Sequence, residues 1–398
     1  MKLSDIAEFI TDKISSSSIS LDNYVTTDSL LQNKRGRELA QNLPPMQCAL
    51  TNYKKGDVLV ANIRPYLKKV WFADSEGGCS SDVLVFRAKN EHYPSFLYAI
   101  LMQDAFFDYA MLGAKGSKMP RGDKNQIMRY ELPTFTSAEE ENIGNIMVDI
   151  ISKINVNRQI NDNLEAMAKQ LYDYWFVQFD FPNEEGKPYK SNGGAMVWNE
   201  KLKREIPEEW NVANVFDELF VQYGFPFSTE LFTEEPTNIP IVRIRDILEN
   251  SVSAYSEEEV DEKYKLQKQD LVIGMDGNFH MNYWNDNVSY LNQRSVRLRA
   301  KSKSTVSIMQ VKYDIEPYIK AKELRVKGST VGHLSDKDLK ELFVLVSPNA
   351  DFRNMFDSIL AEIIENRCEM IALTKQRDEL LPLLMNGQAL VNYHLSAC

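Results

Sequence analysis

The sequence repeats itself at a spacing of about 210 residues. Three pairs of strings carry the repeat, at offsets of 213, 212 and 209: Asp57-Val58-Leu59-Val60 with Asp270-Leu271-Val272-Ile273, Gly116-Ser117 with Gly328-Ser329, and Asn157-Arg158 with Asn366-Arg367. A solenoid repeats every 20–50 residues or so, and this period is far longer. The repeat therefore predicts two similar globular units, each followed by a similar long helix, that contact something which itself comes in two parts.

Length and composition agree with a folded protein of two or three domains, because the chain has 398 residues of which 43% are hydrophobic. No run of about 18 apolar residues occurs, and the N-terminal stretch lacks a cleavage site, so neither a membrane span nor a signal peptide is expected. Four scattered cysteines indicate a reducing, cytoplasmic location without a disulfide frame or a zinc site.

The net charge of −11 is unevenly distributed. Residues 139–185 carry a balance of −7 and residues 351–398 carry −3, so the two expected helices hold almost all of the excess. Basic stretches lie elsewhere, at 54–69 (+4), 115–129 (+4) and 265–327 (+6). Because local basic surface steers phosphate binding, these stretches are compatible with a nucleic-acid partner. The alternative is that they are ordinary solvated faces, which have the same composition.

The hydrophobic pattern predicts an α+β fold with two mixed domains. Strands are expected near 57–61 and 81–86 and again near 240–247, 270–274 and 294–300, and residues 93–112 predict a buried helix. We expect a first mixed domain over 1–136, a long helix over 137–180 that starts at a Ser137/Glu140 capping box, and a linker over 181–206. A second mixed domain is expected over 207–347, and a second long helix with a tail over 348–398.

Each long helix has a narrow apolar seam, which is typical of a coiled coil. Asn157 and Asn366 occupy matching places inside these seams. A buried asparagine fixes the register of a coiled coil, so the two residues predict an antiparallel helix pair with a pseudo-two-fold axis. The alternative is that each asparagine turns to solvent.

Catalytic motifs are missing from the sequence. The four histidines, His92, His280, His333 and His394, have no metal-binding spacing, and His280 and His333 are read as recognition groups at most. No phosphate-binding G-x-x-x-x-G-K-[ST] loop, dinucleotide-binding G-x-G-x-x-G turn or G-x-S-x-G nucleophile elbow occurs. A binding protein is therefore expected, with a stand-alone nuclease or methyltransferase and a protein-binding scaffold as alternatives.

Several strings together carry a family likeness. They are Asn163–Leu171 followed by Tyr174-Trp175-Phe176-Val177-Gln178-Phe179-Asp180, Ile206-Pro207-Glu208-Glu209-Trp210, Gly224-Phe225-Pro226-Phe227, Ile239–Ile247, Leu381-Pro382-Leu383-Leu384-Met385-Asn386-Gly387-Gln388 and, in the first unit, Ala61–Phe72. With the repeated plan of domain and helix, the chain resembles the specificity subunit of Type I restriction–modification systems. The Gly-x-Pro-Phe turn has no counterpart near residues 10–25, so the two domains are different recognition types.

The resemblance implies a subunit without a catalytic centre that reads a split, asymmetric target on double-stranded DNA. It implies two methyltransferase subunits, which bring S-adenosylmethionine and methylate adenine. It also implies two motor–nuclease subunits, which use ATP and Mg²⁺.

Candidate DNA contacts follow from residue chemistry, since lysines suit phosphates while arginine, asparagine and histidine suit base edges. In the first domain they are Lys54, Arg64, Lys68, Lys69, Lys115, Ser117, Lys118, Arg121 and Lys124. In the second they are Arg243, Arg245, Asn278, His280, Asn282, Arg294, Arg297, Lys301, Lys320, Lys327, Ser329 and Thr330. Expected interface residues are Asn157, Tyr172, Trp175, Phe176 and Asn366, of which the three aromatic residues either dock a methyltransferase subunit or close the core.

Overall fold

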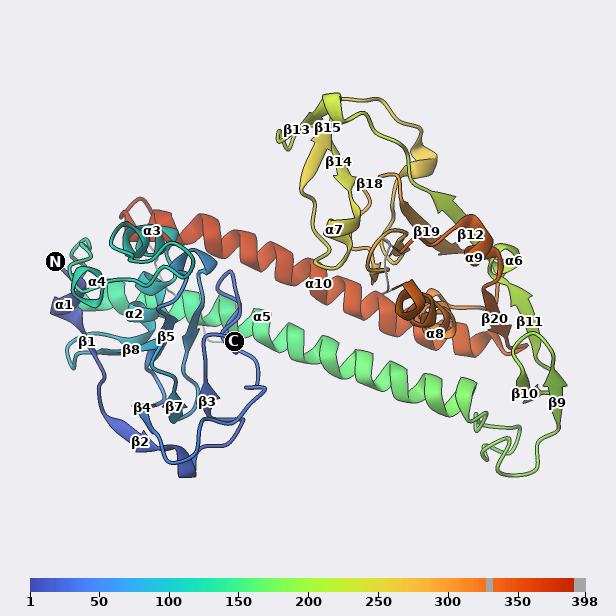
Figure 1. The fold of residues 1–398 in the computed structure, drawn as a ribbon, viewed down its shortest axis with the longest axis horizontal. Coiled ribbons are helices and arrows are strands. Elements are labelled where there is room, and N and C mark those ends of the chain that lie inside the picture. The colour runs from blue at the N-terminus through green and yellow to red at the C-terminus, as the bar shows by residue number, and fades with distance from the viewer. Residues whose placement is uncertain (327–331, 390–398) are drawn as a thin grey trace. The chain divides into compact units, whose positions relative to one another are not determined.

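The structure is a computed structural model that describes residues 1–326 and 332–389 (Figure 1). It separates into two compact units, one formed by Met1–Asn155 with the chain from Ile371 onward, the other by Val156–Met370. Each unit thus contains one globular head, the part of a long helix that follows that head, and a part of the other long helix.

The first head contains two four-stranded sheets. Its main sheet has the order β1-β8-β5-β6, with antiparallel neighbours throughout. Its strands are β1 (Ala7–Phe9), β8 (Val83–Ala88), β5 (Val58–Ala61) and β6 (Val70–Phe72). The smaller sheet, β2-β4-β7-β3, comprises β2 (Lys13–Ser15), β4 (Ala49–Tyr53), β7 (Gly77–Cys79) and β3 (Tyr24–Val25). The predicted strands 57–61 and 81–86 are confirmed as β5 and β8.

Short helices complete the first head: α1 (Leu3–Ile6), α2 (Pro94–Leu101), α3 (Asp104–Leu112) and α4 (Lys124–Ile127). The single helix predicted over 93–112 is two helices. The chain breaks at Gln103, whose extended backbone (φ −65°, ψ 142°) cannot continue a helix. Six consecutive residues of α2 are buried, so hydrophobicity alone could not reveal the break.

The second head repeats the main sheet with the equivalent order β12-β19-β16-β17. Its strands are β12 (Leu219–Tyr223), β19 (Ser295–Ala300), β16 (Leu271–Gly274) and β17 (Met281–Tyr283), and they confirm the predictions near 270–274 and 294–300. The smaller sheet, β13-β15-β14-β18, comprises β13 (Phe232–Thr233), β15 (Ala254–Ser256), β14 (Ile239–Val242) and β18 (Tyr290–Leu291). The remaining elements are β11 (Asn211–Asn214), α6 (Val215–Glu218), α7 (Ile244–Ile247), α8 (Ile308–Val326), α9 (Asp336–Lys340) and β20 (Phe343–Val346).

Two expectations for the second unit need correction. The strand predicted over 240–247 ends at Val242, because the Asp246 carboxylate accepts a hydrogen bond from the Arg243 amide (3.0 Å) and starts helix α7. The stretch expected to be a linker, 181–206, contains a hairpin of β9 (Met196–Asn199) and β10 (Arg204–Pro207). Ile206 of this hairpin is buried in the unit's core.

The long helices are α5 (Ser137–Tyr172), which continues into a π-helical turn over Asp173–Val177, and α10 (Ala350–Met385). In the first unit, Ile143 and Met147 of α5 share a hydrophobic cluster with Leu381 and Leu384 of α10. In the second unit, Ala168 near the end of α5 shares a cluster with residues near the start of α10. Since the start of each helix packs beside the end of the other, the pairing is antiparallel, as predicted.

The seam of this pair contains amide side chains. Asn157 and Asn366 are both buried, as the coiled-coil prediction requires. Asn366 Nδ2 donates to Asn161 Oδ1 (3.0 Å), and Asn161 Nδ2 donates to the carbonyl of Ile363 (3.1 Å). Asn157 Nδ2 donates to a carboxylate oxygen of Glu369 (2.5 Å). Each amide therefore has a specific partner on the opposite helix, and a shift in register would leave it unpaired.

Candidate nucleic-acid interface

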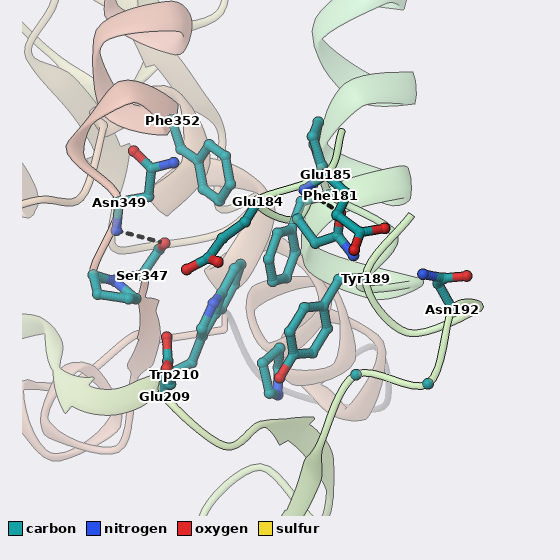
Figure 2. Close-up of a pocket in the computed structure, with 16 residues that line it drawn as sticks. Phe181, Glu184, Glu185, Tyr189, Asn192, Glu209, Trp210, Ser347, Asn349 and Phe352 are labelled. Atoms are coloured by element: carbon teal, nitrogen blue, oxygen red, sulfur yellow. Dashed lines mark hydrogen bonds between the residues drawn. The ribbon is translucent and has the colours of Figure 1, made fainter. Parts of the chain in front are cut away.

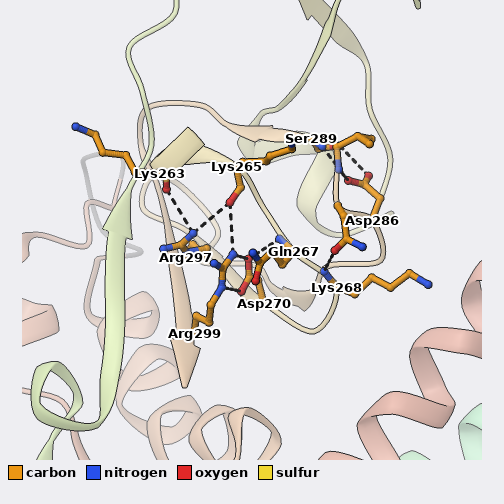
Figure 3. Close-up of polar contacts among 11 residues, drawn as sticks. Lys263, Lys265, Gln267, Lys268, Asp270, Asp286, Ser289, Arg297 and Arg299 are labelled. Atoms are coloured by element: carbon orange, nitrogen blue, oxygen red, sulfur yellow. Dashed lines mark hydrogen bonds and ion pairs between the residues drawn. The ribbon is translucent and has the colours of Figure 1, made fainter. Parts of the chain in front are cut away.

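A buried ion pair lies at the centre of the repeat in each head. Asp57 and Asp270, just before β5 and β16, are almost completely buried. Arg87 donates from Nε (2.7 Å) and Nη2 (2.7 Å) to the two oxygens of Asp57. Arg299 binds Asp270 in the same two-pronged way, at 2.7 and 2.6 Å (Figure 3). The same geometry in both heads shows that the sequence repeat is a structural repeat.

The repeat extends to the end of each main sheet, at a junction of three segments that we call the tip. The first tip consists of residues 62–64, Asp82 and residues 120–122. The second consists of residues 275–277, Arg294 and residues 332–334.

Three main-chain hydrogen bonds close both tips in the same pattern. In the first tip they are Asn62 N–H to Asp82 O (2.8 Å), Arg64 N–H to Pro120 O (2.8 Å) and Gly122 N–H to Asn62 O (3.2 Å). In the second they are Met275 N–H to Arg294 O (2.8 Å), Gly277 N–H to Gly332 O (2.9 Å) and Leu334 N–H to Met275 O (2.7 Å). Each pair of bonds is related by the offset of 212 or 213 residues, so both heads present loops on an identical frame.

Basic side chains gather at the first tip. Arg121 pairs through its main chain with Ile63 and with Lys115, which brings the loop 115–121 beside Arg64. Arg64, Lys115, Ser117, Lys118, Arg121 and Lys124 are all exposed there. Arg121 forms an ion pair with Asp82 (3.0 Å), and Lys115 lies 3.5 Å from Asp123. Six of the nine predicted contacts of the first domain thus share one surface.

The second tip is built differently on the same frame. Arg294, in the left-handed region (φ 63°), binds Asp276 through Nη1 (2.5 Å). His333 contacts the other oxygen of Asp276 through Nδ1 (2.6 Å). Partial burial acts to raise the pKa of Asp276, but Arg294 and His333 outweigh it and hold that pKa below its ordinary value. Asn278 and His280 lie in the turn beside them, where the His280 amide donates to the Asn278 carbonyl (2.8 Å).

Four of the side chains predicted to contact DNA instead donate hydrogen bonds to main-chain carbonyls of the protein itself. Arg297 is 7% exposed and donates to the carbonyls of Lys263 (3.4 Å) and Lys265 (3.2 Å), as Figure 3 shows. Asn282 donates to the carbonyls of two residues at the end of α7. Lys301 donates to the carbonyls of Phe216 (2.9 Å) and Asp217 (2.8 Å), and Lys69 donates to Thr27 O. Burial lowers the pKa of both Arg297 and Lys69.

The other predicted contacts are not among the residues that form the tips. Lys68 pairs with Asp104 (2.9 Å) and Lys320 with Glu316 (2.6 Å). Arg243 donates to the Ser253 carbonyl (2.7 Å), whereas Lys54 and Arg245 are exposed. Lys327, Ser329 and Thr330 lie outside the described residues.

The aromatic residues predicted at a subunit interface close the core of their own unit. The Trp175 ring packs at a tilt of 32° against that of Phe352, with a centroid separation of 4.6 Å, and Phe176 is fully buried. The Tyr172 hydroxyl donates to Asp314 (2.7 Å), a partly buried carboxyl of α8. This burial favours the alternative in which the three rings close the core.

One hollow of the second unit differs chemically from the tips. It has a volume of about 630 Å³ and lies where α10 begins (Figure 2). Its lining includes Glu184, Glu185 and Glu209, the rings of Tyr189 and Trp210, and no lysine or arginine. Its carboxylates would repel phosphate, so its charge does not favour a nucleic-acid site.

Sequence reasoning missed Asp82 and Asp276 as tip residues, and Asn161 as a seam amide. A signal for the tips existed, because Arg121 and His333 are related by the repeat offset of 212 and so are Asp82 and Arg294.

Among the described residues, no helix is long and apolar enough to cross a membrane, and no group of three or more His, Cys, Asp or Glu side chains could hold a metal ion.

These features together define a protein with two structurally related heads and an antiparallel pair of long helices. The chain belongs to the Type I restriction modification DNA specificity domain family, whose model matches residues 1–166 and 207–382. It is 24% identical to the Type I restriction enzyme MjaIX specificity subunit of Methanocaldococcus jannaschii over 356 residues, which cover 86% of this chain and 79% of the relative.

It is also 26% identical to the Type I restriction enzyme EcoBI specificity subunit of Escherichia coli over 216 residues, 52% of this chain and 41% of the relative. The crystal structure of the Type I restriction–modification S subunit from M. genitalium has the same fold, with a TM-score of 0.56 at 15% identity and coverage of 97% and 95%. The chain is therefore a specificity subunit and not itself an enzyme. Neither the scaffold alternative nor the stand-alone enzyme gains support from these relatives.

Proposed function

We propose that the two tips are the faces with which this subunit contacts double-stranded DNA, each reading one half of a bipartite, asymmetric target. The observation that supports this most strongly is the shared frame of main-chain hydrogen bonds, which presents exposed cations at the same place in two heads of different sequence. A rigid frame with variable side chains suits a common task performed on different base sequences.

At the first tip we assign phosphate contacts to Lys118 and Lys124. Both are exposed, and neither has an ion-pair partner among residues 1–326 and 332–389. A free lysine loses little when it binds a phosphate, and it carries no base specificity.

The partners belong to the same proposal. Two methyltransferase subunits would bind S-adenosylmethionine and methylate adenine, and two motor–nuclease subunits would use ATP and Mg²⁺ in the cytoplasm. This chain would supply only recognition and assembly, for which the antiparallel helices offer exposed apolar residues such as Ile160 and Met167.

Salt dependence of DNA binding tests the assignment of the face. Binding of a duplex by the complex with methyltransferase subunits should weaken linearly in log–log form as salt rises, and Lys118→Ala or Lys124→Ala should each reduce that slope by about 1. Lys203→Ala is the matched control, since Lys203 is 72% exposed and pairs with Glu200 on a surface far along the chain from both tips. Unchanged slopes in the first two variants would refute this DNA face.

A further inference from the structure

Each tip carries one exposed arginine that a carboxylate holds in place. Arg121 is 58% exposed, and its Nη2 lies 3.0 and 3.3 Å from the two oxygens of Asp82. Its main chain is fixed on both sides, because its N–H and C=O both bond to Lys115 at 2.9 Å. Arg294 is 66% exposed, and its Nη1 contacts Asp276. Both guanidinium groups are therefore oriented yet accessible.

The two pairs are assembled from different positions of the same frame. Arg121 corresponds by offset to His333, and Asp82 corresponds to Arg294. The arginine thus comes from the loop segment in the first head and from the start of β19 in the second. The carboxylate comes from the start of β8 in the first head and from the end of β16 in the second. Two independent arrangements place the same pair at the same junction.

The carboxylate beside each arginine indicates whether that arginine binds a phosphate or a base. An arginine intended for a phosphate gains nothing from a neighbouring carboxylate, because that negative charge repels the phosphate oxygens. A neutral base edge is not repelled in this way. The carboxylate contacts one amino group of each guanidinium, and the remaining N–H groups can donate elsewhere.

Guanine is the base edge that fits. It presents two acceptors, O6 and N7, in the major groove, and a guanidinium that has only donors can bind both. Adenine offers a donor at N6 in the position of O6, and cytosine offers a donor at N4. Prior orientation of the arginine also reduces the entropy lost on binding.

We propose that each tip reads one guanine, through Arg121 held by Asp82 in the first half-site and through Arg294 held by Asp276 in the second. This inference rests on the proposed DNA face. It goes beyond it by naming the reading groups and the base.

Methylation profiling of cells that express each variant with the methyltransferase subunits tests the proposal. Arg121→Ala should make one G·C position of the first half-site degenerate and leave the second half-site unchanged, with discrimination at that position reduced roughly 5- to 150-fold. Arg294→Ala should do the converse. Arg→Lys at either place should restore the preference for guanine only in part, because lysine can donate to O6 and N7 but lacks the rigid planar fork of arginine.

Competition binding with purified complexes covers the case of a variant that no longer methylates. Replacing each guanine of the target in turn by 7-deazaguanine removes N7, and the wild type should lose affinity at one position in each half-site. Arg121→Ala should show no further loss at its position. The matched variant Asp82→Asn should keep the base preference in weakened form.

The outcomes separate the two proposals. If Arg121→Ala and Arg294→Ala leave base preference unchanged while Lys118→Ala still reduces the salt slope, the tips contact DNA but the guanine assignment is wrong. If the lysine variants also have no effect, the DNA face itself is wrong. A relaxed position occupied by a base pair other than G·C would likewise overturn the guanine assignment.

Discussion

Asp270→Ala should destabilise the second unit more than any surface change, because Asp270 is the acceptor for three donors at the start of β16. Two of them come from Arg299, and the third is the amide of Gln267 (2.7 Å). The side chain of Asp270 is 1% exposed, whereas that of Arg299 is 27% exposed.

The size of the expected loss in stability follows from this difference in exposure between Asp270 and Arg299. Breaking a buried ion pair by removing one partner costs about 3–5 kcal/mol, since the other charge is left uncompensated. Arg299 can recover part of its hydration, so the lower part of that range applies. We therefore expect a loss of about 3 kcal/mol for Asp270→Ala, and a smaller loss of about 1–2 kcal/mol when Arg299→Met is added, because no orphaned charge remains.

Urea unfolding followed by tryptophan fluorescence measures this loss. Trp210 and Trp284 are buried reporters in the second unit, whereas Trp71 is the buried tryptophan of the first head. Asp57→Ala is the matched variant and should act on the signal from Trp71. A change of less than about 1 kcal/mol in either unit, or a double variant no better than the single one, would refute the argument that the ion pair organises each head.

Two further predictions concern the helices. Asn161→Leu alone should lower the free energy of unfolding in urea by about 1–3 kcal/mol, because Asn366 is left buried without its acceptor. The double variant with Asn366→Leu should be nearly neutral. Equal losses for the single and double variants would contradict the pairing of the two amides. Burial raises the pKa of Asp314 to about 6, so between about pH 4 and pH 6 the folded state binds more protons than the unfolded state. The free energy of unfolding should therefore fall by about 2–3 kcal/mol as the pH rises through this range. Asp314→Asn should remove that part of the pH dependence of urea unfolding.

Local patterns predicted much of the architecture. Strands β5 and β16, which follow Asp57 and Asp270, could be predicted as short apolar runs bounded by turn residues, since such runs suit a fully buried strand. The helices α5 and α10 were visible because their apolar residues recur every three or four positions. By contrast, the break at Gln103 and the turn into α7 depend on single backbone conformations that hydrophobic periodicity does not report.

The candidate site shows where sequence reasoning ends. Charge identified fifteen lysine and arginine residues as candidate contacts, but it could not say that Arg297 donates into the protein while Arg294 remains exposed. Those fates depend on which loop lies across each side chain. Contacts such as Arg121 with Asp82, or His333 with Asp276, join residues 39 and 57 positions apart.

The sequence by itself determined that the protein is built twice, with two mixed domains, two long helices and amides in the helix seam, because these follow from periodicity and from repeated strings. Only the tertiary structure decided which cations share a surface and which carboxylates hold them. The reason is physical: burial and ion pairing depend on distances between segments remote in the chain, and no local pattern of residues encodes those distances.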